Sequence, residues 1–287
     1  MGYSVAVGKK KENLLYFTGA PRSEHMGQIL LFNKVNNNWT VAQRLSGEQM
    51  GSYFGAELCS VDIDSDGNTD FLLVGAPMFH QPPREGRIYV YTLTDKLELR
   101  MEMNVSVPSQ GRFGSSISSL TDLNGDGLKD VAVGAPLEDD SRGAVYIYLG
   151  EKLRGIRNEF SQRISAAMIR SKLQFFGQTI DGKMDLDEDG LTDIVVETVL
   201  SVSTHLHFHP SEISTDNFDC LGRETISPVV TLTACFNMAE ATKSKAGALS
   251  AGMNISYSLD VDPVRQRSRA FYSDTNKGPE DFALLWS

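Results

Sequence analysis

The sequence lacks the features of a membrane span, a common enzyme or a nucleic-acid-binding protein. It holds no run of about 18 apolar residues, so no segment is predicted to cross a bilayer. The motifs G-x-S-x-G, H-E-x-x-H and G-x-x-x-x-G-K-[ST] are absent, and no Cys/His nucleophile pair is recognisable, so we expect no enzyme activity. Acidic residues outnumber basic ones by 37 to 27, and the net charge of −10 disfavours a nucleic-acid partner.

The most informative feature is a short acidic loop that occurs three times, with first acids at 62, 122 and 185. We call these acidic loop 1 (62–70), acidic loop 2 (122–130) and acidic loop 3 (185–193). Each has oxygen-bearing side chains at positions 1, 3, 5 and 9 and glycine at position 6, where a sharp bend is needed. The side chains are Asp62, Asp64, Asp66 and Asp70; Asp122, Asn124, Asp126 and Asp130; and Asp185, Asp187, Asp189 and Asp193. Hard oxygen ligands at this spacing predict calcium sites.

The acidic loops differ from the EF-hand. That motif needs a bidentate Glu at position 12, where this chain has Leu73, Val133 and Val196. Apolar β-forming residues follow at 71–74, 131–133 and 194–196, so each loop is predicted to join two strands. The alternative is an Asp/Gly-rich turn that binds no metal, but three copies of one pattern favour the metal sites.

The repeat extends beyond the loops. Phe-Gly occurs at 54–55, 113–114 and 176–177, and Gly-Ala-Pro at 19–21, 75–77 and 134–136. Alternating strand-like segments follow at 27–32, 86–91 and 143–148. Four strand-sized segments in each unit of about 60 residues are typical of a β-propeller blade.

The order Phe-Gly, acidic loop, Gly-Ala-Pro resembles the FG-GAP repeat of integrin alpha subunits. The amino-acid sequence at 51–59, 112–116 and 133–138 resembles that of the leukocyte type of alpha subunit, which carries an inserted ligand-binding domain. The resemblance implies an all-β fold in which 1–202 form about three and a half propeller blades of seven, too few to close a ring. It also implies three calcium ions, with the backbone carbonyls of Asn68, Leu128 and Leu191 as further ligands.

After residue 202 the repeat stops, and strand-like segments occur at 206–208, 229–234 and 253–259. The resemblance identifies 203–287 as the start of the integrin thigh domain, an immunoglobulin-like β-sandwich, with a disulfide between Cys220 and Cys235. Cys59 is either a buried small apolar residue, which we favour, or the partner of a cysteine outside this chain. The Lys9-Lys-Lys11 run is interpreted as a solvated loop.

The implied function is that of a cell-adhesion receptor subunit on the extracellular side of the plasma membrane. In the family, the propeller pairs with a beta subunit and the inserted domain, whose metal-binding motif is absent here, binds a protein ligand. Glycosylation sequons begin at Asn38, Asn104 and Asn254, as expected for an exported protein. Residues 1–9 do not read as a signal peptide, so we interpret the chain as an internal piece of a larger receptor. The alternatives are a secreted FG-GAP protein or enzyme, such as an anchor-cleaving phospholipase, and a non-functional truncated product.

Overall fold

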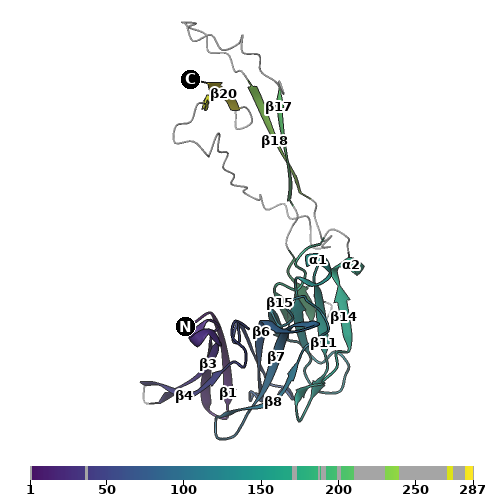
Figure 1. Cartoon of the computed structure of the whole chain (residues 1–287). Helices are drawn as coiled ribbons and strands as arrows, with labels where there is room; N and C mark the ends of the chain where they lie inside the picture. Colours follow the sequence, from purple (N-terminus) through teal and green to yellow (C-terminus); the bar gives the residue numbers. More distant parts are fainter. Residues whose placement is uncertain are drawn as a thin grey trace. The chain divides into compact units, whose positions relative to one another are not determined.

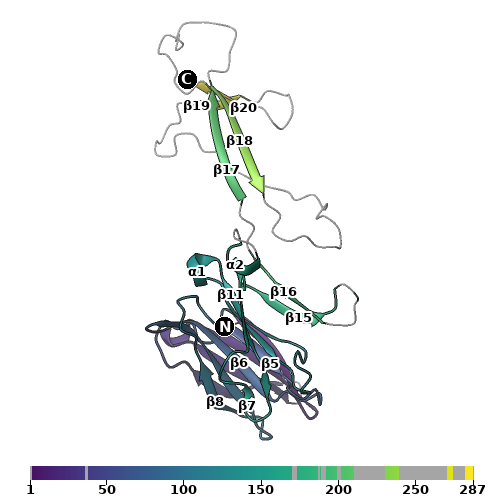
Figure 2. The ribbon, with the colours of Figure 1, turned by 90° about the vertical axis from the view of Figure 1, so that its right-hand side faces the viewer.

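The computed structural model describes residues 2–35, 38–169, 173–186, 188, 192–198, 202–209, 230–238, 270–273 and 282–286. The chain divides into two compact units, Met1–Leu200 and Ser201–Ser287 (Figures 1 and 2). The named strands of both units pair antiparallel, which confirms the predicted all-β fold. No helix in the described part of the chain is long and apolar enough to cross a membrane.

The first unit contains five sheets among its described residues, and four of them follow one another along the chain as what we call blades A to D. Blade A contains β1 (Ser4–Lys10), β2 (Asn13–Ala20), β3 (Gln28–Val35) and β4 (Asn38–Ser46); blade B contains β5 (Glu57–Val61), β6 (Phe71–Gln81), β7 (Arg84–Leu93) and β8 (Leu99–Val105); blade C contains β9 (Ser116–Ser119), β10 (Val131–Ala135), β11 (Ala144–Tyr148) and β14 (Gln162–Ser165); and blade D contains β15 (Ile180–Met184) and β16 (Asp193–Val196). Among the described residues there are thus three four-stranded blades and a two-stranded one, as the partial propeller requires.

Short elements occupy the connections of the first unit. A small hairpin, β12 (Gly150–Glu151) and β13 (Gly155–Ile156), lies between β11 and β14. The helical turns in the described part of this unit are η1 (Ser23–His25), α1 (Glu138–Ser141) and α2 (Ala166–Ile169). The prediction of strands rather than long helices is therefore confirmed for this unit.

The second unit contains one four-stranded sheet among its described residues. Its order is β17 (Val202–His209), β18 (Val230–Met238), β20 (Phe282–Trp286) and β19 (Ala270–Ser273). Two of the three strands expected here coincide with β17 and β18, while 253–259, Cys220 and Asn254 lie outside the described residues. The sandwich and the disulfide to Cys235, which lies in β18, stay predictions.

The hydrophobic core of the first unit lies between neighbouring blades. Successive side chains of a strand point to opposite faces of its sheet, so β6 contributes to two clusters. Leu72 and Val74 pack with Phe17 of blade A, whereas Phe71 and Leu73 pack with Val131 of blade C. The central strands read as almost continuous apolar runs because both of their faces are covered.

β6 is longer than the segment predicted at 71–74. It continues through the Gly-Ala-Pro motif to Gln81, with a register irregularity between Ala76 and His80. The extension exists because β7 pairs with it again beyond the irregularity, His80 with Glu85 and Gln81 with Arg84. The Gly-Ala-Pro motif of blade B is thus part of a strand.

The glycines of the two repeat motifs bring neighbouring blades together. A Cβ atom on Gly19 would lie 2.0 Å from the carbonyl oxygen of Gly55, and one on Gly75 would lie 2.2 Å from that of Gly114. In each pair a Gly-Ala-Pro glycine faces the Phe-Gly glycine of the next blade. The close approach of the two backbones therefore requires a residue without a side chain.

Candidate metal centre

Each acidic loop connects the first and second strands of a blade, as predicted: β5 to β6, β9 to β10 and β15 to β16. All three close with the same hydrogen bond, from the N–H at position 2 to Oδ2 of the aspartate at position 9. The pairs are Ile63 to Asp70 at 3.1 Å, Leu123 to Asp130 at 2.8 Å and Leu186 to Asp193 at 2.7 Å. Position 4 has a left-handed backbone in all three, with φ of 60° at Ser65, 77° at Gly125 and 59° at Glu188. The described parts of the three loops therefore share one local geometry.

Acidic loop 1 brings three carboxylates to metal-binding distances. One oxygen each of Asp62, Asp64 and Asp70 lie within 4.8 Å of one another. Calcium binds oxygen at about 2.3–2.6 Å, so ligand atoms on opposite sides of one ion are separated by about 5 Å. The three carboxylates therefore fit a common calcium ion. Asp66 instead accepts hydrogen bonds from the N–H of Asn68 at 2.7 Å and from its Nδ2 at 3.1 Å.

Acidic loop 2 is held together by hydrogen bonds within the loop. The Asp122 carboxylate accepts the N–H groups of Gly125 at 2.7 Å and Gly127 at 2.6 Å, and Nδ2 of Asn124 donates to Oδ2 of Asp126 at 2.9 Å. Within the described ranges, the tight grouping of three carboxylates occurs in acidic loop 1 and not in acidic loop 2.

Acidic loop 3 is described at Asp185 and Asp193 but not at Asp187, Asp189 or Leu191, which lie outside the described residues. Its shared closure hydrogen bond and its left-handed position 4 are the structural links to the other two loops.

The loop carboxylates differ in electrostatic environment. Burial raises the pKa of Asp70 and, in the equivalent position, that of Asp130, which is fully buried. Backbone N–H donors, chiefly that of Gly127, lower the pKa of Asp122. A divalent cation supplies the positive charge that buried carboxylates need in order to stay ionised.

Basic side chains around acidic loop 1 are the part of this site that the sequence interpretation missed. Lys10 Nζ lies 3.3 Å from Asp70 Oδ1, and the Lys10 side chain is only 14% exposed, so the prediction of a solvated lysine run was wrong for this residue. Lys129 Nζ lies 3.7 Å from Asp62 Oδ2, and Lys152 Nζ lies 4.0 Å from Asp64 Oδ2. These lysines come from positions distant in sequence, so spacing alone could not pair them with the loop.

The other predicted residues in the described part of the chain have simple environments. Asn38 on β4 and Asn104 on β8 are exposed, as a glycosylation site must be. Cys59 on β5 is an unpaired, buried thiol in the core between blades B and C, and burial raises its pKa to about 11. This agrees with the interpretation of Cys59 as a small apolar residue.

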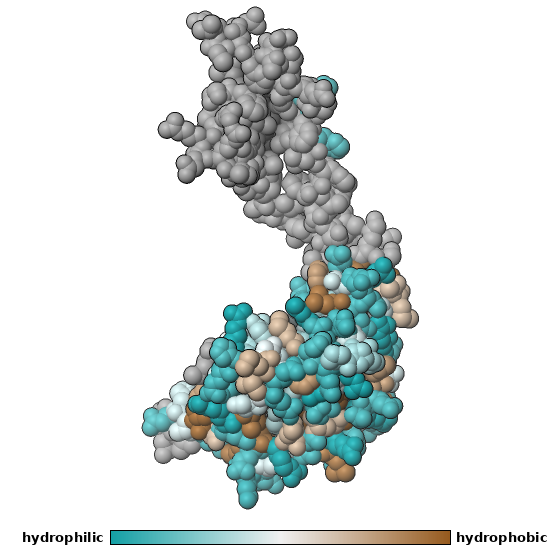
Figure 3. Space-filling view, viewed as in Figure 1, coloured by the Kyte–Doolittle hydropathy of each residue, from teal (hydrophilic) through white to brown (hydrophobic). Residues whose placement is uncertain are grey.

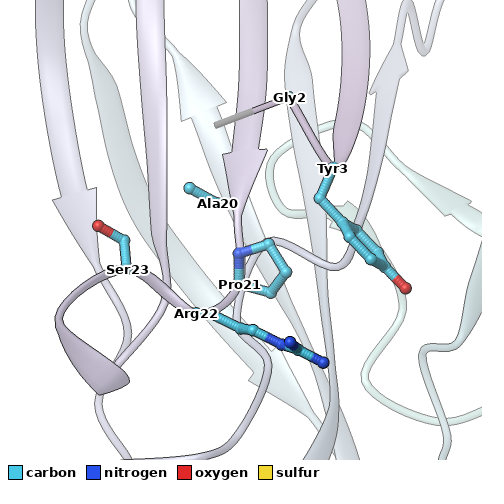
Figure 4. A pocket seen from close by; sticks show the side chains of 6 residues that line it. All are labelled: Gly2, Tyr3, Ala20, Pro21, Arg22 and Ser23. Atoms are coloured by element: carbon cyan, nitrogen blue, oxygen red, sulfur yellow. The ribbon is translucent and has the colours of Figure 1, made fainter.

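A pocket of about 400 Å³ lies at the other end of blade A from acidic loop 1, where β2 ends (Figure 4). It is lined by Gly2, Tyr3, Ala20, Pro21, Arg22 and Ser23. Arg22 donates a hydrogen bond to the hydroxyl of Tyr53 and lies over that ring at 5.5 Å, while Tyr3 packs edge-on to Tyr53 at 6.3 Å. The face of the first unit drawn in Figure 3 is mostly hydrophilic, with scattered apolar residues.

Comparison with known proteins gives a family for this arrangement. Residues 54–91 and 113–148, in blades B and C, match the FG-GAP repeat. The chain is 37% identical to integrin alpha-X of Mus musculus over 294 residues, which cover 96% of this chain and 25% of that protein. It is 44% identical to integrin alpha-11 of Homo sapiens over 237 residues, 77% of this chain and 20% of that protein. Integrin alpha-M of Mus musculus is 34% identical over 294 residues, 96% of this chain and 25% of that protein.

The chain thus spans about a quarter of the length of the curated relatives that it matches. The repeats, the propeller blades and the identity of 34 to 44% over most of the chain show that it belongs to the integrin alpha subunit family.

Proposed function

We propose that this chain is part of the extracellular region of an integrin alpha subunit, a cell-adhesion receptor chain that works by binding and not by catalysis. Its propeller blades bind calcium in the three acidic loops. The observation that carries the proposal is the convergence of Asp62, Asp64 and Asp70, whose ligand atoms lie within 4.8 Å of one another. The predicted ligand sets of acidic loops 2 and 3 follow by their shared loop fold.

Calcium in acidic loop 1 would join three blades. Thr69 donates its N–H to Lys9 O of blade A at 2.6 Å, and Asn68 Oδ1 accepts the N–H of Lys11 at 2.6 Å. On the other side, the N–H of Lys129 in blade C donates to Ile63 O at 2.8 Å. Fixing the loop with an ion therefore stabilises contacts that hold blade B to both of its neighbours. Extracellular calcium modules have dissociation constants of about 0.1–1 mM, which suits a protein outside the cell.

We further infer that the parent protein pairs with a beta subunit, of the leukocyte type, through the propeller, and that its protein ligand binds an inserted domain outside this segment. Tyr3, Arg22 and Tyr53 support a protein contact at the end of blade A opposite the acidic loop, because aromatic residues and arginine are enriched at protein interfaces. Exposed Asn38 and Asn104 support an extracellular, glycosylated surface. The proposed bridge between Cys220 and Cys235 belongs to the same compartment.

The test compares thermal unfolding of the full chain in about 2 mM calcium with its unfolding in chelator. This calcium concentration is close to that outside cells. At about 0.1 mM affinity, one occupied site adds about 2 kcal/mol to the free energy of unfolding, which raises the melting temperature by several degrees. Asp64→Ala should remove the contribution of acidic loop 1, whereas Asp95→Ala, at a 77% exposed acid outside the loops, should leave the calcium effect unchanged. Equal melting of the unmodified chain in calcium and in chelator would refute the calcium function.

A further inference from the structure

Each of the three converging carboxylates of acidic loop 1 has a lysine of its own. Asp70 is paired with Lys10 at 3.3 Å, Asp62 with Lys129 at 3.7 Å and Asp64 with Lys152 at 4.0 Å. The lysines come from three different elements: the end of β1, acidic loop 2 and the turn between β12 and β13. The carboxylates of acidic loop 2 differ, since among the described residues only Asp126 has an ion pair, with Arg157 at 3.8 Å.

We propose that Lys10, Lys129 and Lys152 are built-in counter-ions that hold the carboxylates of acidic loop 1 together without metal and weaken its affinity for a divalent cation. The inference rests on the proposed calcium function and concerns how tightly that site binds. Three carboxylates within 4.8 Å repel one another, and an ammonium beside each lowers that repulsion. When a divalent cation enters the same group, the lysines become like charges close to it. The lysines therefore stabilise the empty loop more than the occupied one.

The three lysines differ in how easily they can move away. The Lys10 side chain is 14% exposed, and its Nζ also donates to Thr69 O at 3.3 Å, so it is fixed in place. Lys129 is 31% exposed and Lys152 is 74% exposed. A long exposed side chain can swing into solvent, where its charge is screened, so Lys152 should affect affinity least.

Lys129 is the most informative of the three. It occupies position 8 of acidic loop 2, and its own N–H donates to Ile63 O inside acidic loop 1 at 2.8 Å. Its backbone is therefore fixed against the loop whose Asp62 its side chain neutralises. Removing the charge by Lys129→Gln leaves that backbone contact in place, so the variant isolates the electrostatic effect.

The experiment is a calorimetric calcium titration of the full chain, with melting in chelator and in calcium. Lys129→Gln should bind calcium at acidic loop 1 about three- to tenfold more tightly, the size expected for one nearby unit charge facing a divalent ion in a largely aqueous setting. Lys129→Arg, which keeps the charge, and Arg44→Gln, which removes one positive charge from exposed β4, should change the affinity less than about twofold. The binding event of acidic loop 1 is the one that Asp64→Ala abolishes.

Melting separates this role from a merely structural one. Lys129→Gln should melt below the unmodified chain in chelator, because Asp62 loses its partner, yet show a larger rise on adding calcium. A Lys129→Gln affinity that is unchanged or weaker would overturn the counter-ion proposal while leaving calcium binding intact. Absence of the Asp64-dependent event in the unmodified chain would overturn the proposed function and this inference together.

Discussion

At the scale of single residues, Glu57 departs from its structural equivalents. It pairs with Gly75 as Ser4 pairs with Gly19 and Ser116 with Gly134. The serine hydroxyls donate to the next blade, Ser4 to Gly55 O at 2.8 Å and Ser116 to Gly177 O at 2.7 Å. An ionised carboxylate has no proton to donate, and burial raises the pKa of Glu57 to about 7 from an ordinary value of 4.5. Blade B therefore carries an acid where its neighbours carry a donor.

The raised pKa predicts that stability falls as the pH rises. The folded chain holds the Glu57 proton more tightly than the unfolded chain, so this residue favours folding below pH 4.5, and that stability is lost as the pH passes through about 7. At pH 8, urea denaturation should show Glu57→Gln to be more stable than the unmodified chain by about 1–2 kcal/mol, after allowing for partial exposure. At pH 4.5 the two chains should have the same free energy of unfolding. Glu98→Gln, at an exposed acid in the turn after β7, is the matched control. An advantage of Glu57→Gln that does not depend on pH would contradict the assignment.

At the scale of elements, a backbone hydrogen bond joins the Phe-Gly motif of a blade to the second strand of the same blade, or to the residue that follows that strand. The N–H of Gly55 donates to Gly75 O and that of Gly114 to Gly134 O, both at 3.0 Å. In blade D the corresponding acceptor is Glu197 O, at 3.2 Å from the N–H of Gly177. A backbone carbonyl can take this place whatever the side chain, so blade D keeps the hydrogen bond although it lacks the Gly-Ala-Pro motif.

Close approach of the blades makes Gly75 sensitive to substitution. The Cβ atom of Gly75→Ala would lie 2.2 Å from Gly114 O, a backbone atom that cannot move without displacing blade C. We expect a loss of about 3 kcal/mol in the free energy of unfolding, measured by urea denaturation in chelator. Gly51→Ala meets no atom within 4 Å and has only its φ of 75° to overcome, so it should cost about 1 kcal/mol. Equal losses for the two variants would show that the contact between blades is not tight.

Much of this arrangement could be predicted from the repeats. The spacing of the acidic loops and the apolar segments that follow them predicted the blades, because both patterns are local in sequence. Lys129 beside Asp62 and Gly75 against Gly114 could not be predicted, since these contacts depend on which blade faces which. The length of β6 also escaped prediction, because pairing with β7 resumes beyond a proline that normally ends a strand.

At the scale of the whole molecule, the first unit is stabilised by hydrophobic cores that each form between two neighbouring blades. Phe54 packs with Tyr89 between blades A and B, and Phe113 packs with Tyr146 between blades B and C, with ring centroids 5.2 and 5.5 Å apart. Blade B contributes to both cores, so its folding depends on both neighbours. Calcium in acidic loop 1 would fix backbone contacts of blade B with the same two neighbours, so we expect it to raise the stability of the unit as a whole.

The most direct test of the calcium-binding account is the number of ions that the full chain binds in a calorimetric titration. The account predicts about three ions, one for each acidic loop, with binding at acidic loop 1 lost in Asp64→Ala. A folded chain that binds no calcium would contradict it, because the convergence of Asp62, Asp64 and Asp70 would then be only the geometry of a turn.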